Sequence, residues 1–204
     1  MSAERTRVVV VCPGRGAYTR PELGTLARLE GRGRALIEEA DALRAAAGRP
    51  TLSELDGAER FSPRTHLASA NVSPLIYGLS SAHAVEALVD HEVVAIVGNS
   101  LGWYTALHLG GALEFSEGLR IVEATGAFQQ EHPVGGQLVW PLLDEGWRPD
   151  EELTRAEADA RRRANERGFV APSVRLGGAT VIAGDDPGIS ALEEALPKAK
   201  RGSI

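Results

Sequence analysis

The stretch that decides the fold of this chain is Val93-Val94-Ala95-Ile96-Val97-Gly98-Asn99-Ser100-Leu101-Gly102-Trp103. Five consecutive apolar residues are typical of a short buried strand, and helix-forming residues follow the second glycine. The pattern predicts a strand, a tight turn and a helix, with Ser100 at the apex of the turn. Gly-x-Ser-x-Gly in this setting is the signature of a nucleophile elbow, which presents the serine at a helix N-terminus. The alternative is an ordinary strand-to-helix turn that holds a serine by chance.

A second run of β-branched residues lies near the N-terminus, from Arg7 to Cys12. Such a run is typical of a strand that is buried on both faces of a parallel sheet. It ends in the glycine-containing loop Pro13 to Tyr18, and open α/β sheets place their ligand sites at such carboxyl ends. A dinucleotide-binding loop is the alternative, although Gly14-x-Gly16 lacks the third glycine of that fingerprint.

Helical periodicity fills much of the remaining N-terminal part of the chain. Gly31 and Gly33 predict a break in the first helical stretch, and Thr51 is a candidate N-cap for the second. The expected helices span Pro21 to Ala47, Thr51 to Asp56, Ser73 to Leu88, Leu101 to Leu109 and Ser116 to Gln130.

The pattern changes at Pro133, after which the elements follow a β-α-β-β-α order that is typical of a ferredoxin-like subdomain. The expected strands cover 137–143, 169–174 and 179–183, and the expected helices cover 150–167 and 187–196. We therefore predict an α/β protein with a parallel-sheet core over 1–132, a ferredoxin-like subdomain over 133–197 and a basic connection over 198–204. The run Arg161-Arg162-Arg163 is expected to be a solvated helix face, with docking of an acidic partner as the alternative.

Composition and charge limit the class of protein. The 204 residues are 43% hydrophobic and 25% charged, as in ordinary globular domains, and their formal net charge is -6. That charge argues against a nucleic-acid-binding surface. The single cysteine, Cys12, excludes an internal disulfide and is expected to be a buried thiol. Since there is no zinc-type spacing, signal peptide or membrane-spanning run, we expect a cytoplasmic protein with no metal and no membrane partner.

Together these motifs resemble the acyltransferases of fatty-acid and polyketide synthesis, whose type member is malonyl-CoA:acyl-carrier-protein transacylase. The resemblance covers nearly the whole chain, and the block from Ser100 to Phe128 is its most specific part. The matching segments, in the family's order, are Pro13-Gly14-Arg15-Gly16, Ser73-Pro74-Leu75, Gly98 to Tyr104, Gly111-Ala112-Leu113-Glu114-Phe115 with Arg120-Ile121-Val122, and Val181-Ile182-Ala183-Gly184. The resemblance implies an α/β-hydrolase-like core with an inserted ferredoxin-like subdomain.

The resemblance also implies a two-step acyl transfer. Ser100 would attack the thioester of an acyl-CoA to form an acyl-serine ester, and the thiol of an acyl-carrier protein would then accept the acyl group. The backbone N–H groups of Leu101 and Arg15 would bind the oxyanion. Acyl-CoA is a substrate in this scheme, and no permanently bound cofactor is expected.

Several residues depart from the family's pattern. Asn99 replaces a histidine beside the nucleophile, Trp103 replaces a glutamate, and Arg15 replaces a loop glutamine. Thr125 stands where the family has the arginine that holds the free carboxylate of a malonyl group, and a threonine cannot form that bidentate ion pair. Either the acyl group has no free carboxylate, which we slightly favour, or Arg15 supplies the positive charge from the opposite wall. From the resemblance we expect the transferred group to be a malonyl-type or related acyl group.

No histidine has an evident place as the general base. The family's catalytic histidine follows the ferredoxin-like insertion, whereas this sequence stops at Ile204. Each histidine is expected to have a packing or surface role, and His132 is the first to test; the others are His66, His83, His91 and His108. We expect the sequence to be the N-terminal two-thirds of such a transferase, truncated or split.

Three functions therefore compete. The leading hypothesis is transfer of an acyl group from coenzyme A to an acyl-carrier protein. The second is a non-catalytic or split fragment that acts as a docking subunit, which Asn99, Thr125 and the missing histidine would suit. The third is an α/β-hydrolase esterase, but no histidine lies beyond His132 to complete the order serine, acid, histidine.

Overall fold

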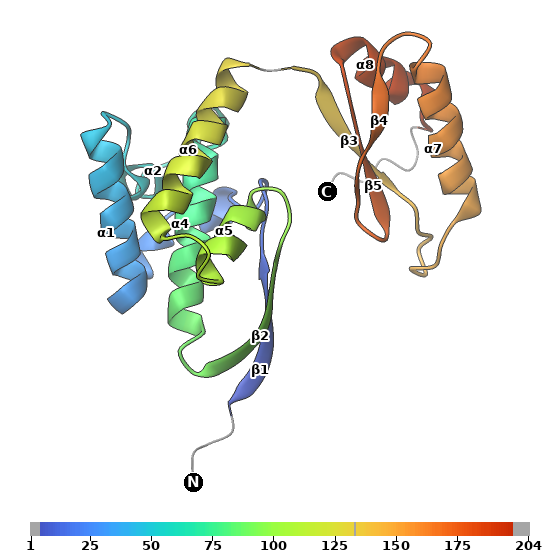
Figure 1. Ribbon diagram of the computed structural model, residues 1–204. Coiled ribbons are helices and arrows are strands. Elements are labelled where there is room, and N and C mark those ends of the chain that lie inside the picture. The colour runs from blue at the N-terminus through green and yellow to red at the C-terminus, as the bar shows by residue number, and fades with distance from the viewer. Residues whose placement is uncertain (1–4, 133, 198–204) are drawn as a thin grey trace. The chain divides into compact units, whose positions relative to one another are not determined.

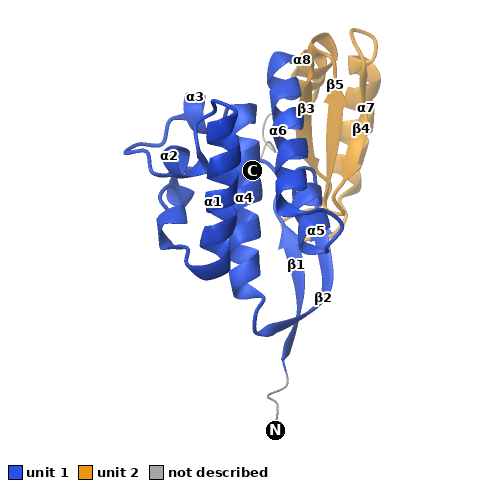
Figure 2. Cartoon of the chain, turned by 60° about the vertical axis from the view of Figure 1, so that its left-hand side comes forward, with its two compact units in different colours: residues 1–132 blue, residues 133–204 orange. Residues whose placement is uncertain are grey.

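The computed structural model describes residues 5–132 and 134–197, which fall into two compact units, unit 1 (1–132) and unit 2 (133–204), coloured separately in Figure 2. The elements of unit 1, in chain order, are β1 (Thr6–Cys12), the 3-10 turns η1 (Arg20–Glu22) and η2 (Leu26–Arg28), α1 (Gly31–Ala46), α2 (Leu52–Asp56), α3 (Pro63–His66), α4 (Ser69–Ala87), β2 (His91–Gly98), α5 (Gly102–Leu109) and α6 (Phe115–Glu131).

The two strands of unit 1 form a parallel pair in which Val9 lies opposite Ala95 and Cys12 lies opposite Gly98. The predicted strands and their parallel pairing are therefore confirmed. The expectation that both strands are buried on both faces is wrong for the described residues. α4 and α5 lie on one side of the pair (Figure 1), and the apolar side chains of the other face are exposed. On this face Val9 and Val11 lie opposite Ala95 and Val97, and all four are exposed; Val93 and Val94, beside the register shift, are exposed as well. A β-branched run predicts a strand, but only a packed layer can bury it.

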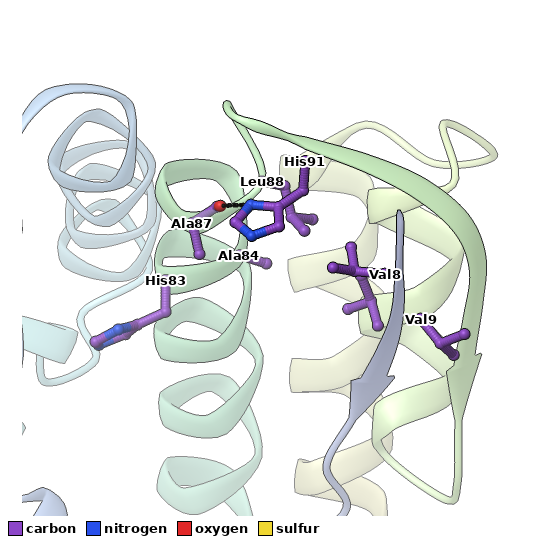
Figure 3. A pocket seen from close by; sticks show the side chains of 8 residues that line it. Val8, Val9, His83, Ala84, Ala87, Leu88 and His91 are labelled. Carbon is purple, nitrogen blue, oxygen red and sulfur yellow. Dashed lines mark hydrogen bonds between the residues drawn. The ribbon is translucent and has the colours of Figure 1, made fainter. Parts of the chain in front are cut away.

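A groove of about 340 Å³ lies between β1 and the C-terminal part of α4. In Figure 3, Val8 points toward α4 and Val9 points to the other side of the strand. The helix side of the groove is formed by His83, Ala84, Ala87 and Leu88, and it is mostly apolar. His91 lines the groove at the start of β2 and donates from Nδ1 to the carbonyl oxygen of Ala87 at 2.8 Å. The groove is therefore at the end of β2 opposite to the elbow.

The hydrophobic core of unit 1 lies among its helices. Ile37, Leu75 and Leu119 are fully buried where α1, α4 and α6 meet. Cap residues explain several helix starts: Thr51 caps α2 as predicted, whereas α6 is capped by Glu114 and not by the predicted Ser116. The predicted helix before Gly31 is absent, and η1 and η2 take its place.

α4 begins at Ser69, one turn earlier than the predicted start at Ser73, so Pro74 lies inside the helix. Proline has no N–H and cannot bond to the carbonyl oxygen four residues before it. The orphaned oxygen is that of Ala70, and Arg44 Nη1 lies 3.5 Å from it as a donor. A side chain from α1 therefore supports the first turn of α4.

Arg44 belongs to a buried ion cluster that joins α1 to α6. Its Nη1 lies 2.7 Å from Glu123 Oε1, and its Nε donates to the carbonyl oxygen of Pro50 at 2.6 Å. Arg49 reaches the other oxygen of Glu123 at 3.0 Å. The side chain of Arg44 is 1% exposed and that of Glu123 is 11% exposed, whereas Arg49 is 42% exposed. Glu123 is thus the acceptor that neutralises a guanidinium with no access to water.

Replacing Glu123 by Gln should lower the free energy of unfolding by about 3–5 kcal/mol, because it leaves the Arg44 charge buried and unneutralised. Urea denaturation followed by the helical circular dichroism signal measures this loss. Arg49→Gln is the matched control, and its loss should be much smaller because Arg49 is partly solvated. Equal losses in the two variants would contradict the central role of the Arg44–Glu123 pair.

Unit 2 contains β3 (Gly136–Pro141), α7 (Glu151–Ala164), β4 (Val170–Arg175), β5 (Ala179–Gly184) and α8 (Asp186–Ala195). Its antiparallel sheet has the order β3-β5-β4. The element order is that of the first five elements of a ferredoxin-like β-α-β-β-α-β pattern. Trp140 is fully buried beneath the helices and donates from Nε1 to the carbonyl oxygen of Leu153 at 3.0 Å.

Two arginines of the run in unit 2 pair within their own helix, whereas Arg163 Nη2 donates to the carbonyl oxygen of Ala195 on α8 at 3.5 Å. Arg161 pairs with Glu157 and Arg162 pairs with Asp159, both on α7. The basic connection predicted for 198–204 lies outside the described residues. In the described parts of the chain, no helix is both long and apolar enough to cross a membrane.

Candidate active site

Ser100 lies at the apex of the turn between β2 and α5, and it is exposed. Its φ is +54°, in the left-handed region that residues other than glycine rarely adopt. The N–H of Gly102 donates to the carbonyl oxygen of Asn99 at 2.9 Å, and the N–H of Trp103 donates to that of Ser100 at 3.1 Å. A strained serine between a strand and a helix is the geometry of a nucleophile elbow. The catalytic role of Ser100 stays a prediction.

The two glycines of the motif are sterically required. A Cβ on Gly98 would lie 2.1 Å from the carbonyl oxygen of Gly102, and a Cβ on Gly102 would lie 2.1 Å from that of Cys12. Both distances are far inside van der Waals contact with backbone atoms that cannot move aside easily. The carboxyl ends of both strands and the first turn of α5 therefore meet in backbone-to-backbone contact beneath Ser100.

The loop that follows β1 packs against the same turn. A Cβ on Gly14 would lie 3.1 Å from the carbonyl oxygen of Asn99 and 3.5 Å from Ser100 Cβ. Within the described residues, neither the Leu101 N–H nor the Arg15 N–H donates a hydrogen bond. These are the two donors predicted to bind an oxyanion, and that role stays a prediction.

Tyr18 anchors this loop in the core. Its side chain is fully buried, and its hydroxyl donates to Asp56 Oδ1 at 2.6 Å. The other carboxylate oxygen of Asp56 accepts from the N–H of Leu26 at 2.8 Å. The ring of Tyr18 stacks on His66 with centroids 6.3 Å apart. Burial, together with the hydrogen bond to Asp56, raises the pKa of Tyr18 well above its ordinary value of 10.

The raised pKa of Tyr18 predicts a loss of stability at alkaline pH. The neutral phenol is favoured in the folded state, so its contribution is complete below pH 10 and decreases as the pH rises above that value. Tyr18→Phe cannot ionise there, and it should be less stable than the parent at pH 7 because it lacks the bond to Asp56. The difference in unfolding free energy between parent and variant should narrow above pH 10.

Urea denaturation of both proteins from pH 7 to 11 measures this difference. Tyr77, whose pKa is also raised by burial, is present in both proteins and cancels in the comparison. A difference that stays constant across this range would contradict the assignment to Tyr18.

A second wall of the site is formed where α4 begins and α6 passes it. Arg15 Nη1 donates to Ser69 Oγ at 3.3 Å. A Cβ on Gly126 would lie 2.6 Å from the carbonyl oxygen of Ser69, so α6 touches the start of α4 at this point. Thr125 is the neighbouring residue on α6, and its hydroxyl donates to the carbonyl oxygen of Ile121 at 2.8 Å. Ser69 therefore connects the Arg15 loop to the part of α6 that carries Thr125.

The other predicted site residues take different places. Asn99 contributes its carbonyl oxygen to the turn and is exposed, and Trp103 is 58% exposed on the first turn of α5. Leu101 turns inward and belongs to the hydrophobic core. Its side chain anchors the turn, and only its backbone is available to a ligand.

No described side chain forms a hydrogen bond with the hydroxyl of Ser100. His66 is buried and hydrogen-bonded at both ring nitrogens, and His108 packs on Phe115 with ring centroids 5.4 Å apart. His132 lies at the end of α6 with its ring against Phe128. These three histidines make packing contacts, although Nε2 of His108 is buried and has no hydrogen-bond partner among the described residues. That no histidine of this sequence is the general base stays a prediction.

Sequence patterns do not reveal two of the residues that shape this site. Ser69 lies before the predicted start of α4 and outside every element that the sequence predicts. Tyr18 closes the glycine-containing loop, and only its partner Asp56, distant in sequence, shows why it is buried. Among the described residues, no cluster of histidine, cysteine and acidic side chains could hold a metal ion.

The left-handed backbone of Ser100 reverses the usual effect of glycine. Ser100→Gly should be more stable than Ser100→Ala by about 1 kcal/mol, because a Cβ is strained at positive φ. At position 124, which is exposed on a helix, alanine is more favourable than glycine, as is usual. Ala124→Gly should therefore lower the free energy of unfolding by about 1 kcal/mol. Urea denaturation of the three variants measures these differences. If Ser100→Ala equalled Ser100→Gly, the elbow would not be strained in solution.

The parallel strands, the glycine-lined turn and the second unit form a fold that is similar to that of solved acyltransferases. The malonyl CoA-acyl carrier protein transacylase from Coxiella burnetii has this fold, with a TM-score of 0.70 and 23% identity over 98% of this chain and 60% of its own. The acyl transferase domain of ZmaA matches with a TM-score of 0.71 and 19% identity, over 93% of this chain and 43% of its own.

A third match is PlMCAT, a malonyl-transacylase solved in complex with AntF, the acyl-carrier protein of a type II polyketide synthase. It has a TM-score of 0.66 and 21% identity, over 93% of this chain and 58% of its own. This chain therefore spans 43–60% of the length of the three structures. No protein-family model and no curated protein matches the sequence. The predicted α/β class and the resemblance of its fold to these acyltransferases are confirmed.

Proposed function

We propose that this chain transfers an acyl group from coenzyme A to the thiol of an acyl-carrier protein, with Ser100 as the nucleophile. The observation that carries the proposal is the strained φ of +54° at Ser100, in a turn whose glycines admit no side chain. An exposed serine held in that conformation at a helix N-terminus serves the attack on a carbonyl better than it serves the fold.

In the first step, Ser100 Oγ forms a bond to the thioester carbon and the coenzyme A sulfur leaves. The proton of the serine hydroxyl ends on the released thiol. The oxyanion that forms between these events is bound by the free N–H groups of Leu101 and Arg15, assisted by the N-terminal dipole of α5. In the second step, the carrier thiol attacks the acyl-serine ester and returns the proton to Ser100.

A general base is needed in both steps, and none of the described side chains forms a hydrogen bond with the Ser100 hydroxyl. The same observation favours a second candidate function. Without such a base, the chain would act as a docking subunit that binds acyl-CoA or a carrier protein and does not turn it over.

Incubation with malonyl-CoA or acetyl-CoA tests the proposal. Intact-protein mass spectrometry should show one added acyl group, located on Ser100 by peptide mapping and removed by hydroxylamine. Ser100→Ala should remain unmodified, and Ser116→Ala, a serine on α6, is the matched control that should be acylated like the parent.

Acylation that persists in Ser100→Ala would overturn the assignment of the nucleophile. If neither thioester acylates the parent, but carrier protein or acyl-CoA still binds to the parent and to Ser100→Ala, the docking function replaces the transferase. Continuous hydrolysis of the ester with no transfer to a carrier thiol would instead indicate an esterase.

A further inference from the structure

We propose that Arg15 is a specificity-determining residue, whose guanidinium binds a carboxylate at the end of the acyl group carried by Ser100. This inference rests on the proposed acyl transfer and names its substrate class, a short acyl group with a free carboxylate. From the sequence alone we slightly favour an acyl group with no free carboxylate. The surroundings of Arg15 and Thr125 instead favour a site in which the positive charge has moved from position 125 to position 15.

The guanidinium of Arg15 is held at the site and still has donors to offer. Arg15 is exposed, and its Nη1 donates to Ser69 Oγ at 3.3 Å. Within the described residues no carboxylate pairs with it, and Nε and Nη2 form no hydrogen bond. One contact thus orients the side chain, and the remaining N–H groups can form a bidentate pair with an anion.

Thr125, on the wall of the site that α4 and α6 form, cannot form a bidentate pair with a carboxylate. The Thr125 hydroxyl is uncharged and already donates to the carbonyl oxygen of Ile121 within α6. Ser69 connects the loop that carries Arg15 to α6. Its hydroxyl accepts from Arg15, and its carbonyl oxygen lies against Gly126. The guanidinium of Arg15 is therefore oriented toward the part of α6 that carries Thr125.

The position of Arg15 favours the acyl carboxylate over the phosphates of coenzyme A. Gly14, the preceding residue, lies against Ser100, and a Cβ on it would be 3.5 Å from Ser100 Cβ. The N–H of Arg15 is one of the two free oxyanion donors, so its side chain begins beside the acyl carbonyl. A carboxylate one or two carbons beyond that carbonyl is within reach, whereas the phosphates lie beyond the whole pantetheine arm.

Single-turnover acylation of Ser100, followed by mass spectrometry, tests this inference. The parent should react faster with malonyl-CoA than with acetyl-CoA. In Arg15→Gln, which keeps the backbone N–H, the malonyl-to-acetyl rate ratio should fall roughly 10- to 100-fold, the range expected for one charge-assisted bidentate contact. Arg15→Lys should recover part of the ratio. Arg20→Gln, a nearby arginine on η1, is the matched control and should keep the parent ratio.

Repeating the assay with malonyl-pantetheine, which has no phosphate, distinguishes binding of the acyl carboxylate from binding of the coenzyme A phosphates. An Arg15→Gln effect that persists with this substrate supports the acyl carboxylate, whereas an effect that vanishes assigns Arg15 to the coenzyme A phosphates and overturns the inference. An unchanged malonyl-to-acetyl ratio in Arg15→Gln also overturns it, while acylation of Ser100 in that experiment leaves the proposed function intact.

Failure of the proposed function is recognised separately. If no thioester acylates Ser100, calorimetric titration of the Ser100→Ala protein with malonyl-CoA and acetyl-CoA measures recognition without chemistry. A malonyl preference that Arg15→Gln abolishes would support carboxylate binding by a docking subunit. Equal affinities for the two thioesters would overturn the inference.

Discussion

The candidate site depends on one close approach of backbone to backbone, at Gly102. The α-carbon of this residue lies so near the carbonyl oxygen of Cys12 that no side chain fits between them. Gly98 is held in the same way against Gly102, so β1, β2 and α5 are joined with no intervening layer of side chains. Because the chain must reverse in so little space, Ser100 takes a left-handed conformation and its hydroxyl is turned out of the fold.

Two buried polar contacts keep the surrounding loop and helices in place. Tyr18 ties the loop after β1 to Asp56, and Arg44 ties α1 and the first turn of α4 to Glu123 on α6. Neither contact involves a residue that would touch substrate. Both are directional, however, and a hydrogen-bonded buried group fixes geometry more narrowly than apolar packing does. One of them holds the loop that carries Arg15, and the other holds the first turn of α4, which carries Ser69.

Sequence patterns predicted those parts of the fold that depend on neighbours along the chain. The strands, the turn at Ser100 and the cap at Thr51 all follow from local residue order. The start of α4 could not be predicted, because Pro74 marks a helix start unless a distant arginine satisfies the carbonyl oxygen that proline leaves unbonded.

Burial of the strands and the contacts of the site could not be predicted either. A valine run reports strand propensity and says nothing about which layers cover it, so Val9 and Val11 were expected to be buried and are exposed. The contact between Arg15 and Ser69 joins residues 54 positions apart, and neither residue belongs to a motif that indicates the other. Long-range polar contacts of this kind leave no periodic pattern in the sequence from which they could be predicted.

The open face of the β1–β2 pair has a consequence for how unit 1 is held together. Its continuous apolar core is formed by the helices and the segments between them, and no residue of either strand belongs to it. Leu101 does belong to it, and Tyr104 packs against it. The elbow is therefore held by the packing of Leu101 and Tyr104 against the core. Separation of the strands at their far end need not disturb that packing. Local fluctuations of the strands at their far end can therefore occur beside a turn that stays strained.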